Sequence, residues 1–500
     1  MNIKKGILVF CLLLCLNYLK AQQEFPAYNE PFRPQVHFSP KEHWMNDPNG
    51  MVFYKGVYHL FYQYYPNGIT WGPMHWGHAI SKDLMHWKEL PIALYPDSLG
   101  YIFSGSAVVD SNNTSGFGRD GKIPLVAIFT HHDPKGEKEG KNTFQNESIA
   151  YSLDEGNTWI KYDGNPVLKN PGIRDFRDPK VMWYAKEKKW VMTLATLDHI
   201  TFFSSPDLKD WKKESEFGKE IGAHGGVWEC PDLFPLKLNG KTYWVLIVNL
   251  NPGGPNGGSA TQYFVGEFNG NKFTPIDNTL RWADYGPDEY AGVTWSNTGS
   301  RKIFLGWMSN WQYANQVPTE KWRNAMTIPR ELGLKQVNGN ILLTSSPVKE
   351  LSILEQKQHE PDNSLSKGKQ VTIPGRFVLK LNITKIGDYA IVLSNSNSEK
   401  MIIGYQRGSN RYYIDRTKSG KIDFNPQFAK IAYSPRFTDA AASNLVLVVD
   451  GSSVELFADN GLSVMTEIFF PGKVYNQLQI SKQKKLGINN LKLLRLKSIW

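Results

Sequence analysis

The chain has 500 residues, of which 13% are aromatic, 41% hydrophobic and 21% charged. This composition excludes a disordered chain, a collagen and a coiled coil, and the length allows a sizeable core and more than one domain. Many aromatic residues together with 43 Gly and 29 Pro favour short strands joined by turns.

The first 21 residues have the pattern of a secretory signal peptide. Lys4 and Lys5 precede an apolar run over 6–16, and Ala21 stands at the presumed cleavage site. The run is too short to span a bilayer, so we expect an exported protein, periplasmic or extracellular, without stable membrane insertion after cleavage. Removal of residues 1–21 also removes Cys11 and Cys15. Cys230 would then be left without a partner for an intramolecular disulfide.

The net charge of +10 is unevenly distributed along the chain. Residues 355–500 carry +9, whereas residues 22–354 carry −2. A basic module suggests either an anionic partner or a solvated basic surface, and the second interpretation is favoured. No nucleic-acid motif accompanies the charge, so no nucleic-acid partner is expected.

Residues 22–345 are predicted to form one large domain of strands. Short apolar runs at 50–54, 57–62, 180–184 and 190–194 are typical of strands, and 55–56 and 186–189 are typical of hairpin turns. A weak repeat places an Asp before a Trp in three segments, 81–87, 152–159 and 205–211. Its unequal spacing argues against a solenoid and favours propeller blades, about five of them at roughly 60 residues each. In each copy we expect the Asp to cap a turn and the Trp to pack between sheets.

Residues 346–500 are predicted to form a second module with its connecting linker. The segment 356–368 is polar and contains Pro, as in a linker. Beyond it, alternating runs at 377–381, 390–393 and 445–449 predict antiparallel strands packed as a β-sandwich.

Three short segments combine carboxylates with Pro, Trp or Arg. They are 44–50, which contains Asp47, 176–179, which contains Asp178, and 228–232, which contains Glu229. Each alone has a structural explanation as a turn, an ion pair or a strand edge. Asp178 follows Asp47 by 131 residues and Glu229 follows Asp178 by 51, which is about two blades and one blade. Because equivalent inner strands converge on a propeller axis, the three carboxylates are predicted to meet in one funnel.

The same segments resemble the signatures of glycoside hydrolase family 32, the β-fructofuranosidases. Residues 44–50 match the family's nucleophile motif, 177–179 its second signature and 229–231 its third. The blocks at 71–79, 103–106, 306–313 and 453–461 match further parts of the family in order. The resemblance implies an all-β protein with a five-bladed β-propeller followed by a C-terminal β-sandwich.

The resemblance also implies a role for each carboxylate. Asp47 would be the nucleophile that forms a fructosyl-enzyme, and Glu229 the acid/base that protonates the leaving oxygen and then activates water. Asp178 would hold fructose hydroxyls and stabilise the oxocarbenium-like transition state. A retaining mechanism predicts a separation of roughly 5–5.5 Å between the carboxyls of Asp47 and Glu229. Cys230, next to Glu229, would either tune that group or be a small buried residue.

The remaining predicted site residues bind the sugar. Aromatic rings offer an apolar face to its C–H groups, while amide, hydroxyl and guanidinium groups bind its hydroxyls or orient the carboxylates. By resemblance these are Trp44, Asn46, Gln63, Trp71, Phe103, Ser104, Arg177 and Trp311. The histidines at 75, 78, 131 and 132 form no convincing metal-ligand set, so neither metal nor cofactor is expected.

The sequence therefore predicts a retaining hydrolase that releases fructose from fructans such as levan or inulin, from sucrose, or from both. Exo action is favoured over endo action because a funnel accepts a chain end. A catalytically inactive fructan-binding protein is the non-enzymatic alternative, although all three carboxylates are present. A sialidase shares the turn motif at 152–159, but no blocks match its arginine triad and Tyr nucleophile.

Overall fold

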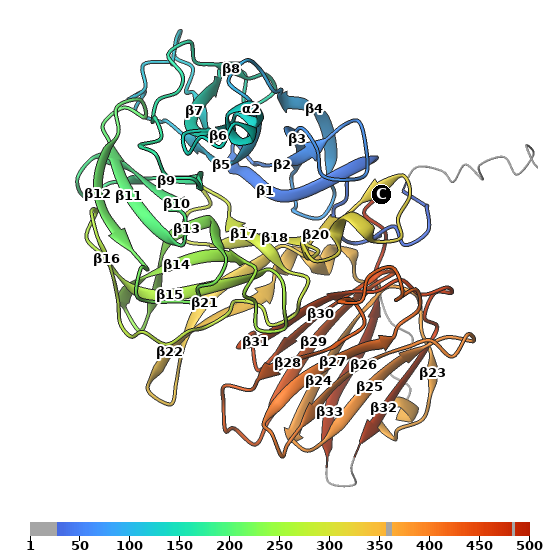
Figure 1. The fold of residues 1–500 in the computed structure, drawn as a ribbon. Coiled ribbons are helices and arrows are strands. Elements are labelled where there is room, and N and C mark those ends of the chain that lie inside the picture. Colours follow the sequence, from blue (N-terminus) through green and yellow to red (C-terminus); the bar gives the residue numbers. More distant parts are fainter. Residues whose placement is uncertain (1–27, 357–362, 483–485) are drawn as a thin grey trace, which may run out of the picture.

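The computed structural model describes residues 28–356, 363–482 and 486–500. The predicted signal peptide, 1–21, lies outside the described residues. Within them, the strands form five sheets in the first part of the chain and two in the second (Figure 1). The predicted five-bladed propeller and β-sandwich are both confirmed.

The propeller sheets follow chain order, one blade after another. The first contains β1 (His43–Tyr54), β2 (Val57–Tyr65), β3 (His75–Ser81) and β4 (Lys88–Leu94), with β19 (Trp322–Arg323) parallel to β1. The second contains β5 (Tyr101–Val109), β6 (Leu125–His132), β7 (Gln145–Ser152) and β8 (Ile160–Lys161), with α2 (Pro134–Lys138) between β6 and β7. The third contains β9 (Phe176–Tyr184), β10 (Lys189–Thr196), β11 (His199–Ser205) and β12 (Lys212–Phe217). The fourth contains β13 (Val227–Leu238), β14 (Lys241–Asn251), β15 (Ala260–Phe268) and β16 (Phe273–Pro275). The fifth contains β17 (Tyr290–Thr294), β18 (Ile303–Met308), β20 (Ala325–Met326), β21 (Arg330–Val337) and β22 (Asn340–Pro347).

The first strand of each sheet lines the propeller axis. β1 contacts β5, β5 contacts β9, β9 contacts β13, β13 contacts β17, and β17 contacts β1. The five strands therefore close a ring, and the other strands of each blade extend outward from it (Figure 1).

Local sequence explains the turns of the blades. The predicted hairpin tip between β1 and β2 is confirmed, and Lys55 and Gly56 both have positive φ, as a two-residue turn of type I′ requires. The repeated Asp-to-Trp motif joins the third and fourth strands of the first three blades. In each copy the Asp carboxylate accepts backbone N–H groups and the Trp indole donates to a turn carbonyl, as for Asp83 and Trp87. The predicted role of the Asp as a turn cap is confirmed.

The second module is a sandwich of two antiparallel sheets. One contains β23 (Val371–Thr372), β32 (Gln477–Lys482), β25 (Tyr389–Ser394), β26 (Lys400–Gln406), β27 (Arg411–Lys418) and β28 (Ile431–Pro435). The other contains β31 (Ser463–Ile468), β30 (Ser453–Ala458), β29 (Ser443–Asp450), β24 (Phe377–Lys385) and β33 (Gly487–Arg495). Inward side chains such as Leu379, Leu381 and Ile391 form its core. Two 3-10 helices, η1 (Ala314–Gln316) and η2 (Lys349–Leu354), and the short α3 (Asn363–Ser366) lie outside the sheets.

Buried ion pairs join the propeller to the sandwich. Arg330 of the fifth blade donates to Asp284 at 2.8 Å and to Glu455 of β30. Arg416 of β27 donates to Asp288, at 2.5 Å, in the segment before β17. These side chains are at most 2% exposed. Because an unpaired buried charge is strongly destabilising, the pairs fix the sandwich against the propeller in one orientation.

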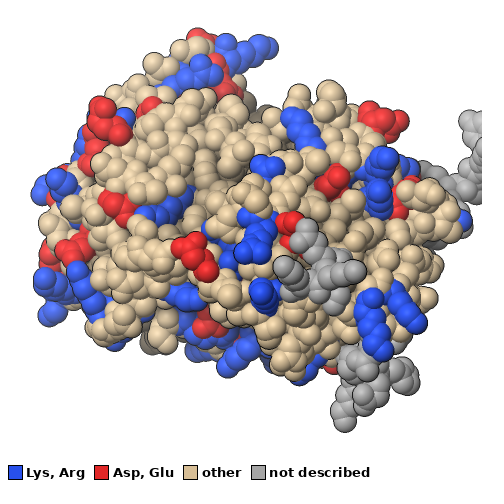
Figure 2. Space-filling model, turned by 90° about the horizontal axis from the view of Figure 1, so that it is seen from below, with Lys and Arg blue, Asp and Glu red and all other residues tan. Residues whose placement is uncertain are grey.

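Lys and Arg side chains do not gather in one patch on the face of the molecule seen from below. Figure 2 shows Lys and Arg side chains spread over this face and interrupted by acidic and uncharged residues. This distribution fits the favoured interpretation of a solvated basic surface. Among the described residues, no helix is long and apolar enough to cross a membrane.

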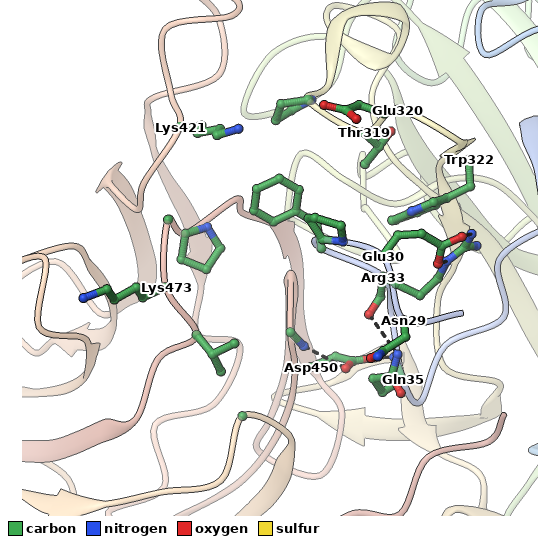
Figure 3. A pocket seen from close by; sticks show the side chains of 18 of the residues that line it. Asn29, Glu30, Arg33, Gln35, Thr319, Glu320, Trp322, Lys421, Asp450 and Lys473 are labelled. Atoms are coloured by element: carbon green, nitrogen blue, oxygen red, sulfur yellow. Dashed lines mark hydrogen bonds and ion pairs between the residues drawn. The ribbon is translucent and has the colours of Figure 1, made fainter. Parts of the chain in front are cut away.

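A groove of about 780 Å³ lies where the N-terminal segment, the loop before β19 and the sandwich meet (Figure 3). Two of its acidic groups, Glu30 and Asp450, are engaged in structural contacts. Arg33 is paired with Glu30, and Asp450 accepts the backbone N–H groups of Gln35 and Val36. This groove is therefore where the N-terminal segment is held against the sandwich.

His37 anchors the same segment. Its ring contacts Asp450 at 3.0 Å and Glu455 at 2.9 Å, and all three side chains are fully buried. Burial lowers the pKa of His37, but the hydrogen bonds to Asp450 and Glu455 outweigh it and raise the pKa to about 9. The folded protein therefore holds a charged imidazolium between two carboxylates.

We expect His37→Gln to lower the free energy of unfolding by about 3 kcal/mol at pH 6, because two buried carboxylates lose their cation. An imidazole pKa raised from about 6.5 in the unfolded chain stabilises the fold fully below pH 6.5. That contribution is lost as the pH rises through 9. Urea unfolding of both proteins at pH 6 and pH 9.5 measures the difference, with exposed His86→Gln as the control. An equal deficit at both pH values would contradict a charged His37.

Candidate active site

A two-residue bulge interrupts each of the five innermost strands where the site lies. In every case two residues of the strand face one residue of its neighbour. The bulges lie at 46–47, 103–104, 178–179, 230–231 and 291–292, opposite Gln63, Thr130, Leu194, Val248 and Gly306. Most of the predicted site residues stand at these bulges or beside them.

Three of the bulges contain a residue with positive φ, and the neighbouring sequence lowers the cost of this backbone conformation. Asp178, Cys230 and Ala291 have φ of 66°, 42° and 54°, which costs L-residues conformational energy. Pro179 and Pro231 follow two of them and have no N–H group to leave unpaired. The bulges turn the carboxylates out of the pleat and toward the axis.

A cavity of about 410 Å³ opens between the bulges. Ten of the predicted residues line it together: Asn46, Asp47, Gln63, Trp71, Phe103, Ser104, Arg177, Asp178, Glu229 and Trp311. Trp44 does not line it. Its side chain is fully buried and donates its indole N–H to Asn46 Oδ1 at 2.8 Å. Trp44 therefore supports Asn46 from behind, and its ring packs against Trp307 and Trp311.

Three donors orient the Asp47 carboxylate. Asn46 donates to Oδ1 at 2.9 Å, and Ser104 donates to Oδ2 at 2.7 Å from the next blade. The Cys230 thiol lies 3.4 Å from the same Oδ2. A carboxylate held in this way is pre-organised as a nucleophile or as a stabiliser of positive charge.

Asp178 lies deepest of the three carboxylates, at 5% exposure. Its Oδ2 accepts the Cys230 backbone N–H at 2.9 Å, and its own N–H donates to Thr130 Oγ1 at 3.0 Å. Burial raises its pKa, Arg177 lowers it, and Glu229 and Asp47 raise it further, to about 7. Burial and the same carboxylates raise the pKa of the Cys230 thiol well above its usual range. Cys230 is therefore a neutral thiol that contacts two carboxylates rather than a reactive thiolate.

Both oxygens of Glu229 have partners. Arg177 donates to Oε1 at 2.9 Å and is itself held by Asp175 at 2.6 Å. The Tyr290 hydroxyl, from the fifth blade, donates to Oε2 through a short hydrogen bond. Glu229 is thus fixed between a permanent cation and a phenol, in a site that also holds Asp47.

The walls of the cavity offer both apolar and polar surfaces. Trp71 is 40% exposed and meets Phe103 edge to face, and its backbone N–H donates to Asn315 at 2.9 Å. The side-chain amide of Gln63 donates one N–H to Ile102 O at 3.0 Å. Exposed rings beside fixed polar groups suit a sugar, which has C–H faces and hydroxyl edges.

Several site residues were not predicted. Tyr290 contacts Glu229, and His132, Glu137, Gln145, Asp175 and Asn315 line the cavity. Asp175 could have been found, because it stands only two residues before Arg177, close enough in the chain to pair with it. The others come from segments far away in the chain and carry no local signal. In the described part of the chain, no group of three or more His, Cys, Asp or Glu side chains is arranged to hold a metal ion.

Comparison with known proteins assigns the chain to a family. The family model described as the glycosyl hydrolases family 32 N-terminal domain matches residues 37–346, and the family 32 C-terminal model matches 342–495. This chain belongs to glycosyl hydrolase family 32. The predicted family and enzyme class are confirmed: the chain is a β-fructofuranosidase-type glycosidase.

Relatives within family 32 match nearly the whole chain. A levanase of Bacillus subtilis (strain 168) is 45% identical over 513 residues, which cover 99% of this chain and 75% of that protein. An extracellular exo-inulinase of Aspergillus niger is 43% identical and covers 89% of this chain and 90% of its own. Among solved structures, the exo-inulinase of Aspergillus awamori has a TM-score of 0.87 at 38% identity, covering 95% of this chain and 100% of that one. A β-fructofuranosidase of Schwanniomyces occidentalis, complexed with fructosyl-erythritol, has a TM-score of 0.85 at 33% identity, covering 95% and 99%.

We expect Tyr290→Phe to lower kcat about tenfold, because Glu229 loses a hydrogen bond of the strong, charge-assisted kind. Initial rates of fructose release measure the effect. Tyr263→Phe is the matched control, since Tyr263 is also a buried propeller tyrosine and its hydroxyl accepts only the Leu343 N–H among the described residues. Equal rates for both variants would show that the Tyr290 hydroxyl has no part in the reaction.

We expect Cys230 to resist alkylation in the folded protein, because its thiol is 4% exposed and burial raises its pKa. Treatment with iodoacetamide at pH 8, followed by peptide mass spectrometry, measures the modified fraction. The same treatment in 6 M guanidinium is the positive control. Rapid modification of the native protein would contradict the neutral, buried thiol.

Proposed function

We propose that this family 32 glycosidase releases terminal fructose from fructans such as levan or inulin, from sucrose, or from both, with retention of configuration. The observation that carries the proposal is the set of three carboxylates, Asp47, Asp178 and Glu229, that line one cavity from three blades. Their separate hydrogen-bond partners support a different role for each.

In the proposed first step, Asp47 attacks C2 of the fructosyl unit while Glu229 protonates the departing glycosidic oxygen. Asn46 and Ser104 aim the Asp47 carboxylate, and Arg177 and Tyr290 aim Glu229. The bond from C2 to the leaving oxygen breaks, the bond from C2 to Asp47 forms, and the proton passes from Glu229 to the leaving group.

In the second step, Glu229 takes a proton from water, which attacks C2 and releases Asp47. Positive charge develops on the sugar ring in both transition states. Asp178 lines the same cavity as the other two carboxylates, where its ionised form would stabilise that charge and bind ring hydroxyls. Trp71, Phe103 and Trp311 would contact the C–H faces of the substrate.

Exo action is the favoured mode. Asp178, which is 5% exposed, lines the cavity at its buried end, which suits the end of a chain better than its middle. The Aspergillus relatives are extracellular exo-inulinases, which supports the same mode and an exported protein. The proposed protein has a signal peptide at 1–21, a catalytic propeller domain at 22–345, and a β-sandwich domain with its connecting linker at 346–500.

Product analysis tests the proposal. Purified protein and an Asp47→Ala variant are incubated separately with sucrose, inulin and levan, and the sugars are resolved by chromatography. We expect free fructose as the early product, with a rate lowered by about 10⁴-fold or more in the variant, because the nucleophile is lost. The anomer observed first by NMR should have the configuration of the substrate.

Each other outcome has a definite meaning. A ladder of oligosaccharides would keep the mechanism and reverse the exo assignment. First release of the opposite anomer would overturn the retaining mechanism. Absence of turnover on all three substrates would favour a fructan-binding protein with an inactive site.

A further inference from the structure

The free edge of β9 is hydrogen-bonded by side chains of the preceding blade. As the innermost strand, β9 pairs only with β10, so its other edge carries unpaired backbone groups. Gln145 accepts the Phe176 N–H at 2.9 Å, Thr130 accepts the Asp178 N–H at 3.0 Å, and Ser106 accepts the Val181 N–H at 3.0 Å. Thr130 therefore binds the backbone of Asp178, where φ is 66°.

A buried glutamate orients Thr130. Glu147 stands directly opposite Thr130 in the pairing of β6 with β7, and its Oε2 accepts the Thr130 hydroxyl proton at 2.8 Å. With that proton directed to Glu147, the oxygen lone pair of Thr130 faces the Asp178 N–H. The two hydrogen bonds therefore run in one direction: the Asp178 N–H donates to the Thr130 oxygen, and the Thr130 hydroxyl donates to the Glu147 carboxyl oxygen.

The surroundings of Glu147 favour its neutral, protonated form. Its side chain is fully buried, and its Oε1 has no hydrogen-bond partner among the described residues. No Lys or Arg in the described part of the chain forms an ion pair with it. A charged carboxylate in such surroundings would be very costly. Burial and nearby Asp178 raise the pKa of Glu147 well above its usual range, although the Thr130 hydroxyl lowers it.

We propose that Thr130 and Glu147 are positioning residues for Asp178, with Glu147 acting as a neutral hydrogen-bond acceptor. The pair holds the left-handed backbone of Asp178 at the bulge, and so sets where its carboxylate meets the substrate. The inference rests on the proposed role of Asp178 in the reaction. It adds two residues that do not line the cavity and that contact neither Asp47 nor Glu229 in the described part of the chain.

The test compares two pairs of variants with a matched control. Thr130→Val removes the hydroxyl at constant shape, whereas Thr130→Ser keeps it. Glu147→Leu removes the acceptor, whereas Glu147→Gln keeps an uncharged acceptor. Thr201→Val is the control, because Thr201 is a buried propeller threonine whose hydroxyl bonds Thr196 outside the cavity.

We expect kcat to fall about tenfold in Thr130→Val and Glu147→Leu, because each leaves one buried hydrogen-bonding group without its partner, with little change in KM. Thr130→Ser and Glu147→Gln should stay within about threefold of the wild type, and so should Thr201→Val. Rates are measured on folded protein, well below the Tm of each variant. If Glu147→Leu does not fold, the contrast between Thr130→Val and Thr130→Ser still decides.

Two results would overturn the inference. One is the same kcat in Thr130→Val as in Thr201→Val, which would make Thr130 an ordinary core residue. The other is an equal loss in Glu147→Gln and Glu147→Leu, which would require a charged Glu147. An Asp178→Asn variant separates the two proposals, because full activity in that variant would refute the role of Asp178 itself.

Discussion

The architecture depends on the free edge of the innermost strands. In the closed ring of blades, β5, β9, β13 and β17 each pair within their own sheet along one side only, whereas β1 also pairs with the short β19. The edge without a strand partner carries N–H and C=O groups that need partners. The preceding blade supplies them through side chains: Gln63 for Ile102, Thr130 for Asp178, Asn249 for Gly292. The same contacts that close the propeller therefore place the backbone that carries the site.

Asp178 shows how closely structure and chemistry are joined. Its carboxylate accepts the Cys230 N–H, which is one of these inter-blade contacts, and it also lines the cavity. A buried carboxylate with few partners is costly, and burial raises its pKa to about 7. The fold tolerates that cost because Arg177 lies beside it and because the group completes the edge of β13. In the proposed reaction, such a group would face the positive charge that develops on the substrate.

The sandwich contributes through rigidity. Glu455 binds Arg330 of the last blade and His37 of the N-terminal segment, so one buried carboxylate ties three parts of the chain together. The segment from Asn310 to Asn315 brings Trp311 to the cavity. The same segment contains Tyr313, whose hydroxyl contacts Asp288 and Arg416. The second module thereby supports the cavity wall without lining the cavity, since in the described residues the lining comes from the propeller alone.

The sequence by itself determined the strands, the turns and the identity of the carboxylates. Alternating apolar runs, the Lys55–Gly56 hairpin and the Asp-to-Trp turns are local, and the spacing of Asp47, Asp178 and Glu229 follows from the length of a blade. Only the tertiary structure decided the bulges, the burial of Trp44 behind Asn46, and the contacts of Tyr290 and Thr130. These depend on which edge meets which blade, and that is settled when the ring closes and every buried backbone group must find a partner.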